Sequence, residues 1–436
     1  MITGAMKTTA TDVVEVMANL LPFHLLVDKL RHRAAIRLAT LPSSHPLHKP
    51  VANAANRLIK RHATPLHDLM HRYGIQPRGF ETINAVRFDT RWKPKITTEV
   101  TPDTDKAIEA IQRDNPDVKV FADGSGMDGK IGAAAVLYRS GRLKTKLQHQ
   151  LGLQKHHTVY EGEGVGAMLG TKLISNEWNI RSAYIYIDNR ASITATQLTK
   201  PSPGHYIFDA IHANVASLRK KHPGIKVTIK WVPGHSGVEG NEHADEEAKK
   251  AITEGSSNTR DLPTILRKTL PRSKSAAKWT HNEKLKRLAQ KNWQKSKRFD
   301  RMKKTDPTTP SNKYINLVTK LPRKLASILS QLRTGHAPLA KHLHRIGKTN
   351  SPICPACLQS EETVHHFMLH CPAHQAARQT LRNSTGGRNI DVTKIFTSPK
   401  TLCALFKYVA ETGRFHNTFG DLPEIAEEER NERAGR

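Results

Sequence analysis

The sequence predicts an α/β fold, a five-stranded mixed sheet flanked by helices, in the middle of the chain. Short apolar runs rich in β-branched residues are separated by turn glycines, and longer amphipathic stretches follow them. The expected strands are residues 118–122, 131–139, 143–151, 183–187 and 225–232. The expected helices are residues 161–176, 206–221 and 239–252. An antiparallel meander followed by alternating helices and strands is typical of such a sheet, with helices on both faces.

Glycines justify the turns between the first three expected strands. Gly126 and Gly129 precede the second strand, and Gly141 precedes the third. Glycine adopts the backbone angles of tight turns at little steric cost. We therefore expect two hairpins here.

Helical patterns also occur outside the sheet segment. Apolar residues recur at steps of three and four between Leu20 and Ala39, which predicts an amphipathic helix in the N-terminal segment. Residues 90–117 are rich in proline and charge and are expected to form a linker. The C-terminal region is expected to be mainly helical.

The composition favours a polyanionic partner. The chain of 436 residues carries 69 Lys and Arg against 39 Asp and Glu, a net charge of +30, and such an excess is typical of proteins that bind nucleic acid. No apolar run reaches the roughly 18 residues of a membrane helix. Four cysteines do not make the framework of a secreted disulfide-rich domain. We expect an intracellular protein without a membrane partner, and leave open the choice of nucleus or cytoplasm and any protein partner.

Acidic residues occur where two of the expected strands end. Asp123 directly follows the first strand and Asp188 the fourth, while Glu163 and Asp245 lie on expected helices. Because ligands bind at the carboxyl ends of strands in open α/β sheets, these acids can converge on one point. Three or four carboxylates crowded together form a site for divalent metal ions.

Each acid has a simpler explanation when it is taken alone, since an aspartate after a strand is most often a turn residue or a helix N-cap. The four acids in this order, together with the motif Gly-His-Ser-Gly-x-x-Gly-Asn-Glu-x-x-Asp at residues 234–245, favour a catalytic site. Glu161 competes with Glu163 for the helix position, and the register of the apolar residues that follow favours Glu163.

The segment 116–251 resembles ribonuclease H, most specifically in the block WVPGHSGVEGNEHADEEAK. The resemblance implies hydrolysis of the RNA strand of an RNA–DNA hybrid, leaving a 3′-hydroxyl and a 5′-phosphate. Two departures from the family pattern are Ala122, where a β-branched residue is usual, and the glycines on both sides of Glu163. Each glycine costs a helix up to about 1 kcal/mol relative to alanine, so weakened activity is expected.

The resemblance also assigns roles to individual residues. Two Mg²⁺ or Mn²⁺ ions would be held by four acids, Asp123 bridging both ions, Glu163 and Asp188 holding one and Asp245 the other. His235 would assist proton transfer or product release. Ser125 and Asn189, which follow two of the acids closely, are candidate contacts to the nucleic acid.

A basic stretch follows the sheet segment. Between residues 267 and 304 there are fifteen Lys or Arg, with Trp279 and Trp293 among them. Phosphates attract such charges, and the tryptophans could stack on the bases of a hybrid or of single strands. The alternative is a solvated helix whose tryptophans anchor the core, and both explanations can hold together.

Three cysteines and a histidine have the spacing of a structural zinc site. The candidate ligands are Cys354, Cys357, His366 and Cys371. Three thiolates and one imidazole are a common tetrahedral set for Zn²⁺, and binding would stabilise a segment too small to bury a core. His365 and His370 are competing ligands, and a redox pair or reduced structural cysteines are the alternatives to a metal site.

Two further segments resemble one kind of polyprotein. Residues 21–47 are similar to the stretch that joins reverse transcriptase to ribonuclease H in fungal LINE-type (non-LTR) retrotransposons, and Glu-Thr-x-x-His-Phe-x-Leu-x-Cys at 362–371 is similar to their C-terminal end. The polymerase motif Tyr/Phe-x-Asp-Asp is absent from the sequence. The chain thus resembles the C-terminal part of such a polyprotein, which removes template RNA. The alternative is a catalytically decayed product that still binds nucleic acid.

We divide the chain into five expected parts. They are a helical lead-in (1–115), a ribonuclease H domain (116–253), a basic helical connector (254–350), a CCHC-type zinc finger (351–380) and a helical or disordered tail (381–436).

Overall fold

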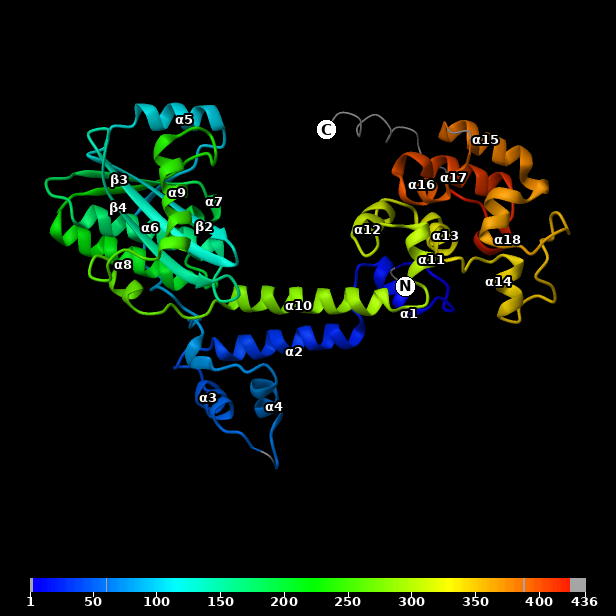
Figure 1. Cartoon of the computed structure of the whole chain (residues 1–436), viewed down its shortest axis with the longest axis horizontal. Coiled ribbons are helices and arrows are strands. Elements are labelled where there is room, and N and C mark those ends of the chain that lie inside the picture. The colour runs from blue at the N-terminus through cyan, green and yellow to red at the C-terminus, as the bar shows by residue number, and fades with distance from the viewer. Residues whose placement is uncertain (1–2, 60, 387–388, 424–436) are drawn as a thin grey trace. The chain divides into compact units, whose positions relative to one another are not determined.

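The computed structural model describes residues 3–59, 61–386 and 389–423 (Figure 1). Contacts divide the chain into two compact units. We call residues 28–283 the sheet unit, and residues 1–27 together with 284–436 the C-terminal unit. The five expected parts of the chain stay a prediction, and the tail beyond residue 423 lies outside the described residues.

The sheet unit contains a mixed sheet, as predicted, with strand order β1-β6-β5-β2-β3-β4. The strands are β1 (Thr97–Glu99), β2 (Val118–Met127), β3 (Lys130–Arg139), β4 (Arg142–Leu153), β5 (Ser182–Ile187) and β6 (Lys226–Trp231). β2, β3 and β4 pair as an antiparallel meander, while β2, β5, β6 and β1 run parallel. All five expected strands are present.

The segment 90–117 is not the linker that its composition suggested. It contributes the sixth strand, β1, whose residues Thr97, Thr98 and Glu99 pair with β6 at the edge of the sheet. It also contains helix α5 (Thr104–Arg113), which Asp103 caps by accepting a hydrogen bond from the backbone N–H of Lys106. A three-residue polar edge strand carries no hydrophobic pattern, so the sequence could not reveal it.

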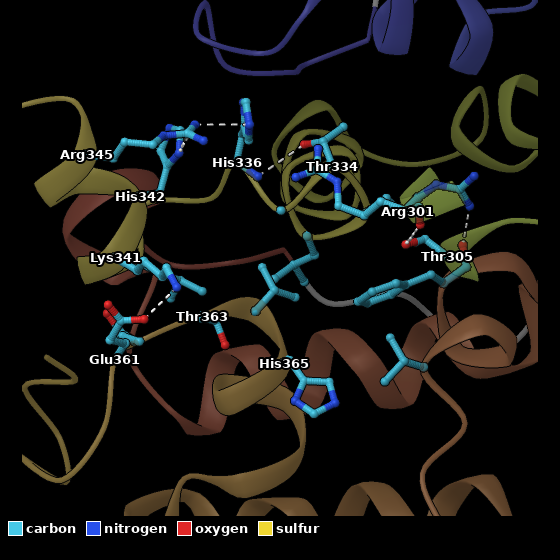
Figure 2. A pocket seen from close by; sticks show the side chains of 18 of the residues that line it. Arg301, Thr305, Thr334, His336, Lys341, His342, Arg345, Glu361, Thr363 and His365 are labelled. Carbon is cyan, nitrogen blue, oxygen red and sulfur yellow. Dashed lines mark hydrogen bonds and ion pairs between the residues drawn. The ribbon is translucent and has the colours of Figure 1, made fainter. Parts of the chain in front are cut away.

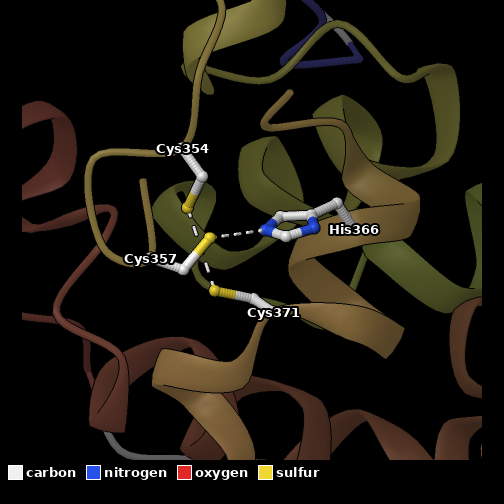
Figure 3. A group of neighbouring side chains, drawn as sticks. All are labelled: Cys354, Cys357, His366 and Cys371. Atoms are coloured by element: carbon white, nitrogen blue, oxygen red, sulfur yellow. Dashed lines mark hydrogen bonds between the residues drawn. The ribbon is translucent and has the colours of Figure 1, made fainter. Parts of the chain in front are cut away.

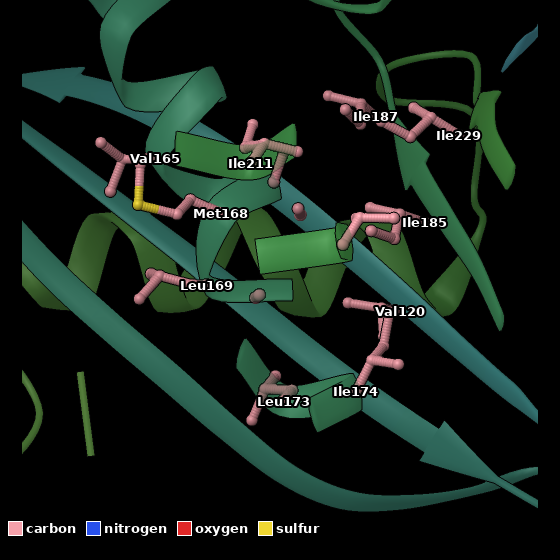
Figure 4. Packing of buried hydrophobic residues seen from close by; sticks show 14 of the residues in the cluster. Val120, Val165, Met168, Leu169, Leu173, Ile174, Ile185, Ile187, Ile211 and Ile229 are labelled. Carbon is pink, nitrogen blue, oxygen red and sulfur yellow. The ribbon is translucent and has the colours of Figure 1, made fainter. Parts of the chain in front are cut away.

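Helices cover both faces of the sheet. They include α6 (Val159–Ser175), α7 (Arg190–Ala195), α8 (His205–Lys221) and α9 (Glu239–Glu254). Side chains alternate between the faces of β2: Val120 and Ala122 join the core shared with α6 and α8, and Phe121 joins the core shared with α5 and α9. Figure 4 shows α6 residues, among them Met168 and Leu169, packed over the strands.

The N-terminal segment is helical, as predicted. The helices are α1 (Thr11–Met17), α2 (Phe23–Ala39), α3 (His48–Asn56) and α4 (Pro65–Arg72). A small core in the sheet unit joins α2, α3 and α4 through Ile36, Val51 and Met70, all almost fully buried.

The C-terminal unit is mainly helical, again as predicted. Its helices are α11 (Phe299–Thr305), α12 (Lys313–Val318), α13 (Arg323–Thr334), α14 (Ala340–Arg345), α15 (Gln375–Thr385), α16 (Val392–Thr397), α17 (Pro399–Glu411) and α18 (His416–Phe419). The long helix α10 (Lys274–Gln294) contains the boundary with the sheet unit. No helix in the described part of the chain combines the length and apolar character that a membrane crossing requires.

Candidate active site

Asp123 lies inside β2 rather than after it, because the strand continues to Met127. Its side chain is buried, and its backbone pairs with Ala134 of β3. The next residue, Gly124, is in contact with α6: a Cβ atom there would lie 2.2 Å from the backbone nitrogen of Glu163. Only glycine permits the strand and the helix to approach so closely, and this approach puts Asp123 beside Glu163.

Helix α6 distinguishes the two neighbouring glutamates. Thr158 caps the helix, and Glu161 completes the capping box by accepting a 2.8 Å hydrogen bond from the backbone N–H of Thr158. Glu161 therefore has a structural role at the start of α6. Glu163, two residues further on, is buried and lies in a cluster with Asp123 and Asp188.

The glycines around Glu163 allow α6 to pack against its neighbours. A Cβ on Gly162 would lie 3.3 Å from the carbonyl oxygen of Gly132, and one on Gly164 would lie 3.0 Å from Ile207. These contacts are tighter than ordinary van der Waals packing. The residues that we expected to weaken the helix are thus the ones that fit it onto the sheet and α8.

Three carboxylates meet where the parallel pairing of β2 and β5 ends. One oxygen each from Asp123, Glu163 and Asp188 lie within 4.8 Å of one another. Burial, and then the charges of Asp188 and Asp245, raise the pKa of Asp123 to about 7. Burial, Asp123 and Asp188 raise the pKa of Glu163 to about 10, and burial also raises that of Asp188. The three groups cannot all ionise without a nearby cation.

The fourth predicted acid, Asp245, lies beside the cluster but not in it. It raises the pKa of Asp123, so the two carboxylates are close. Its own carboxylate accepts a 2.6 Å hydrogen bond from Nζ of Lys249, one helical turn further along α9, and the two form an ion pair. The structure therefore brings three of the four predicted acids together, and Lys249 partly neutralises the fourth.

His235 lies in the loop between β6 and α9, exposed and with a left-handed φ of 52°. Its charge opposes the rise in the pKa of Asp188, which places the imidazole near that carboxylate. A Cβ on the preceding Gly234 would lie 2.9 Å from Oδ2 of Asp188. The loop backbone thus packs directly against the cluster, as the Gly-His motif suggested.

Sequence reasoning missed two residues that position Asp188. The indole Nε1 of Trp231 donates a 2.8 Å hydrogen bond to the backbone carbonyl of Asp188. The guanidinium of Arg190 lies 3.8 Å from the ring centre of the same tryptophan. Trp231 opens the block that resembles ribonuclease H, so its position was visible but its partner was not.

The four candidate contacts to nucleic acid differ in their surroundings. Ser125 is half-buried on β2, and Asn189 caps α7 by accepting a 3.1 Å hydrogen bond from the backbone N–H of Ser192. Trp279 is 51 % exposed, which leaves its ring accessible. Trp293 is 4 % exposed and belongs to the core of the C-terminal unit, so the stacking role expected for it is wrong and the anchor role is the one observed.

The zinc-type residues form a second cluster, in the C-terminal unit (Figure 3). The residues are Cys354, Cys357, His366 and Cys371, and their ligand atoms lie within 4.8 Å of one another. The Sγ atoms of Cys354 and Cys371 are 3.8 Å apart, and Sγ of Cys357 is 3.4 Å from Nε2 of His366. All four cysteines in the described part of the chain are free thiols. The donors are those that a tetrahedral Zn²⁺ prefers.

Buried side chains hydrogen-bond to the backbone that carries this cluster. Arg378 donates hydrogen bonds to the backbone carbonyls of Met368 and Cys371, and the hydroxyl of Tyr408 donates to that of Phe367. The competing histidines, His365 and His370, pair with each other at a ring distance of 4.7 Å. His366 is therefore the imidazole that faces the three sulfurs.

The fold and the carboxylate cluster define an α/β domain with a candidate metal site, and family comparison makes the class specific. Residues 115–253 match the family model for RNase H, and residues 292–377 match a model described as zinc-binding in reverse transcriptase. The chain therefore contains a ribonuclease H domain and a segment that matches the zinc-finger family of reverse transcriptases. A search of curated proteins finds no match.

Solved structures with a similar domain come from several sources. The N-terminal RNase H domain of a Mycobacterium tuberculosis protein is 16 % identical, with 32 % of this chain and 96 % of that chain covered and a TM-score of 0.26. RNase H1 of the archaeon Halobacterium salinarum is 16 % identical, with 31 % of this chain and 98 % of that chain covered and a TM-score of 0.25. The protease–reverse transcriptase of prototype foamy virus is 18 % identical, with 33 % of this chain and 21 % of that chain covered and a TM-score of 0.26.

Proposed function

We propose that the protein is an endoribonuclease that hydrolyses the RNA strand of RNA–DNA hybrids. The convergence of Asp123, Glu163 and Asp188 within 4.8 Å carries this proposal. Two of these acids are buried and Asp188 is half-buried, and burial followed by neighbouring carboxylates raises their pKa values. Groups with such perturbed pKa values cluster at functional sites. The surrounding excess of basic residues suits a polyanionic substrate.

The cluster fits divalent metal ions. Oε2 of Glu163 is buried and has no hydrogen-bond partner among the described residues, and burial, followed by the charges of neighbouring acids, raises the pKa values of Asp123 and Glu163. These residues and Asp188 would hold Mg²⁺ or Mn²⁺, with Asp245 as a fourth ligand once released from Lys249. The bound ions would polarise the phosphodiester and activate water.

The chain's own residues would orient and protonate the reacting groups. Trp231 and Arg190 would keep Asp188 in place through its backbone carbonyl and the stacked indole. His235, exposed at the edge of the cluster, would transfer a proton to the leaving 3′-oxygen or assist product release. Ser125 and Trp279 would contact the nucleic acid.

The second cluster would hold a structural Zn²⁺ ion. Its three thiols and one imidazole are a closed tetrahedral donor set with no position left for substrate. Zinc would stabilise the loop 351–371, which otherwise depends on the buried contacts of Arg378 and Tyr408.

We further propose that the chain is the C-terminal part of a retrotransposon polyprotein of the fungal LINE type, in which it removes template RNA. The support is the order of a ribonuclease H domain and a reverse-transcriptase-type zinc segment, together with the sequence similarity of residues 21–47 and 362–371. An intracellular location and the five-part domain division belong to the same proposal.

The experiment that tests the activity compares three forms of the full chain on an end-labelled RNA–DNA hybrid with Mg²⁺. Wild type is expected to cut the RNA strand, Asp188→Asn to lose cutting while still binding the hybrid, and Asp261→Asn, an exposed matched control, to cut normally. Hybrid binding without cutting by wild type would instead favour a decayed nucleic-acid-binding product.

A further inference from the structure

The C-terminal unit contains a pocket of about 790 Å³ that shares no residue with either cluster (Figure 2). Its walls come from α11, α13, α14, α16 and the segment 361–365. This volume is within the range of small-molecule and cofactor sites in proteins, which is about 300–1,000 Å³.

One wall of the pocket is apolar. Leu332, Leu339 and Phe396 each contribute to it and are 1 % exposed, and Val364 and Val392 lie in the same lining. Val364 and Val392 are half-buried and supply accessible apolar surface, while the other three side chains lie behind it. A ligand in the pocket would bury apolar surface against this wall.

The pocket also has a polar, positively charged side, which is built around Arg345. The guanidinium of Arg345 donates hydrogen bonds to two histidines. Its Nη2 donates hydrogen bonds to Nε2 of His336 at 3.1 Å and to Nδ1 of His342 at 2.9 Å. A ring nitrogen that accepts a hydrogen bond carries no proton, so both imidazoles are neutral. Burial lowers the pKa of His336 to about 4 and lowers that of His342 as well, in agreement with this assignment.

Neutral acceptors orient a guanidinium without cancelling its charge. Two more cations, Arg301 and Lys304 of α11, line the same pocket. Across the described ranges, none of these three cations lies within ion-pair distance of a carboxylate. The acid that acts on Arg301 is Asp12, which is itself bound to Arg298.

The acids in the lining are already neutralised. Glu361 pairs with Lys341 at 2.5 Å, and Glu362 pairs with Arg414 at 2.6 Å. The uncompensated charge of the pocket is therefore positive. In Figure 2, Arg345, His342 and His336 gather together. The charge of Arg301 helps to lower the pKa of His336, and that of Arg345 helps to lower the pKa of Arg301, so the two guanidinium groups act on the same part of the pocket.

We infer that this pocket binds a nucleotide, with the phosphate on Arg345, Arg301 and Lys304 and the base against the apolar wall. Arginine forks match phosphate oxygens, and the combination of an apolar wall with unpaired cations selects a ligand that is flat and apolar at one end and anionic at the other. A free mononucleotide and the phosphorylated end of a strand share this chemistry. The inference does not depend on hydrolysis at the carboxylate cluster.

Calorimetric titration of the full-length, zinc-loaded chain without added Mg²⁺ tests the inference. AMP is expected to bind, and adenosine and inorganic phosphate to bind at least about tenfold more weakly, since each lacks one half of the contacts. Arg345→Gln should weaken AMP binding by about tenfold or more, whereas Lys400→Gln, an exposed charge-matched control outside the pocket, should not.

A second variant guards against misfolding. Arg301 makes no side-chain hydrogen bond within the described residues, so Arg301→Gln should keep the melting temperature and zinc content of wild type and still weaken AMP binding. AMP binding that is unchanged in both arginine variants, or matched by adenosine or by phosphate alone, would overturn the inference. A 5′-phosphorylated trinucleotide that binds more tightly than AMP identifies a strand end as the source, and equal binding identifies the free nucleotide.

Discussion

The indole of Trp231 and the backbone of Asp188 are joined by a 2.8 Å hydrogen bond, across the carboxyl ends of two adjacent parallel strands. Asp188 is the first residue after β5, where the ladder no longer holds the chain, so this bond helps to fix its position, and Arg190 stacks on the indole that donates it. The catalytic proposal depends on that position, because a carboxylate that moves about 1 Å no longer meets its partners.

Replacing Trp231 by Phe should lower the rate of hybrid cleavage while changing the free energy of unfolding only modestly. A smaller aromatic ring remains at this half-buried position, and the loss of one hydrogen bond costs about 0.5–1.5 kcal/mol of unfolding free energy. Cleavage rates and urea denaturation of the variant measure the two effects. Trp178→Phe, at an exposed tryptophan of the same unit, is the control. A variant as active as wild type would show that Asp188 needs no support from the indole.

The carboxylate cluster should make the metal-free chain less stable as the pH rises. Unfolded Asp and Glu titrate near pH 4, whereas the folded pKa values are about 7 for Asp123 and about 10 for Glu163. The folded chain therefore binds more protons over this interval, and raising the pH favours the unfolded chain.

Melting temperatures at pH 5 and pH 8 measure this effect. Glu163→Gln removes one of the titrating groups, so the drop in melting temperature between the two pH values should be smaller in the variant than in wild type. Asp261→Asn provides the matched control for loss of an exposed carboxylate. An equal drop in Glu163→Gln and wild type would contradict the raised pKa.

Mg²⁺ should stabilise the chain through the same cluster. A ligand that binds the folded state alone raises stability by about 2.7 kcal/mol at a hundred times its dissociation constant. The melting temperature of wild type should therefore rise with Mg²⁺ concentration, and that of Asp188→Asn should rise less. Equal shifts in the two proteins would place the bound Mg²⁺ outside the cluster.

Gly166 tests the close packing of α6. Helix propensity alone predicts that Gly166→Ala stabilises the protein by about 1 kcal/mol. A Cβ at this position would lie 2.8 Å from the backbone carbonyl oxygen of Asp123, which cannot move freely. We expect destabilisation by roughly 1–3 kcal/mol, measured by urea denaturation. A stabilised variant would mean that α6 and β2 are further apart than described.

Zinc content tests the second cluster. The wild-type chain should carry about one tightly bound zinc ion, and Cys371→Ser should lose it together with part of the stability of the C-terminal unit. Cys403→Ser keeps all four proposed ligands and should retain the metal. Elemental analysis of the purified proteins measures both, and zinc retained in Cys371→Ser would rule out this ligand set.

Much of the site was readable from the chain because local patterns encode it. Short apolar runs predicted the five main strands, and Asp123 and Asp188 stood out because each comes at the end of such a run. The zinc-type set followed from the spacing of Cys354 and Cys357 before His366. The fold class and the candidate ligands could be predicted because they depend on the order of residues within single elements and at their ends.

The tertiary structure decided those properties that depend on which elements are in contact. The sequence left open whether Trp293 stacks on bases or anchors a core, and only the packing of the C-terminal unit decides that it is buried. Gly162 was expected to weaken its helix, and only the structure shows that the sheet packs closely against it. Likewise, the uncompensated charge of Arg345 follows from two neutral imidazoles, one of them nine residues away in sequence. Close approach, burial and charge pairing are properties of pairs of elements, and no local pattern records the partner.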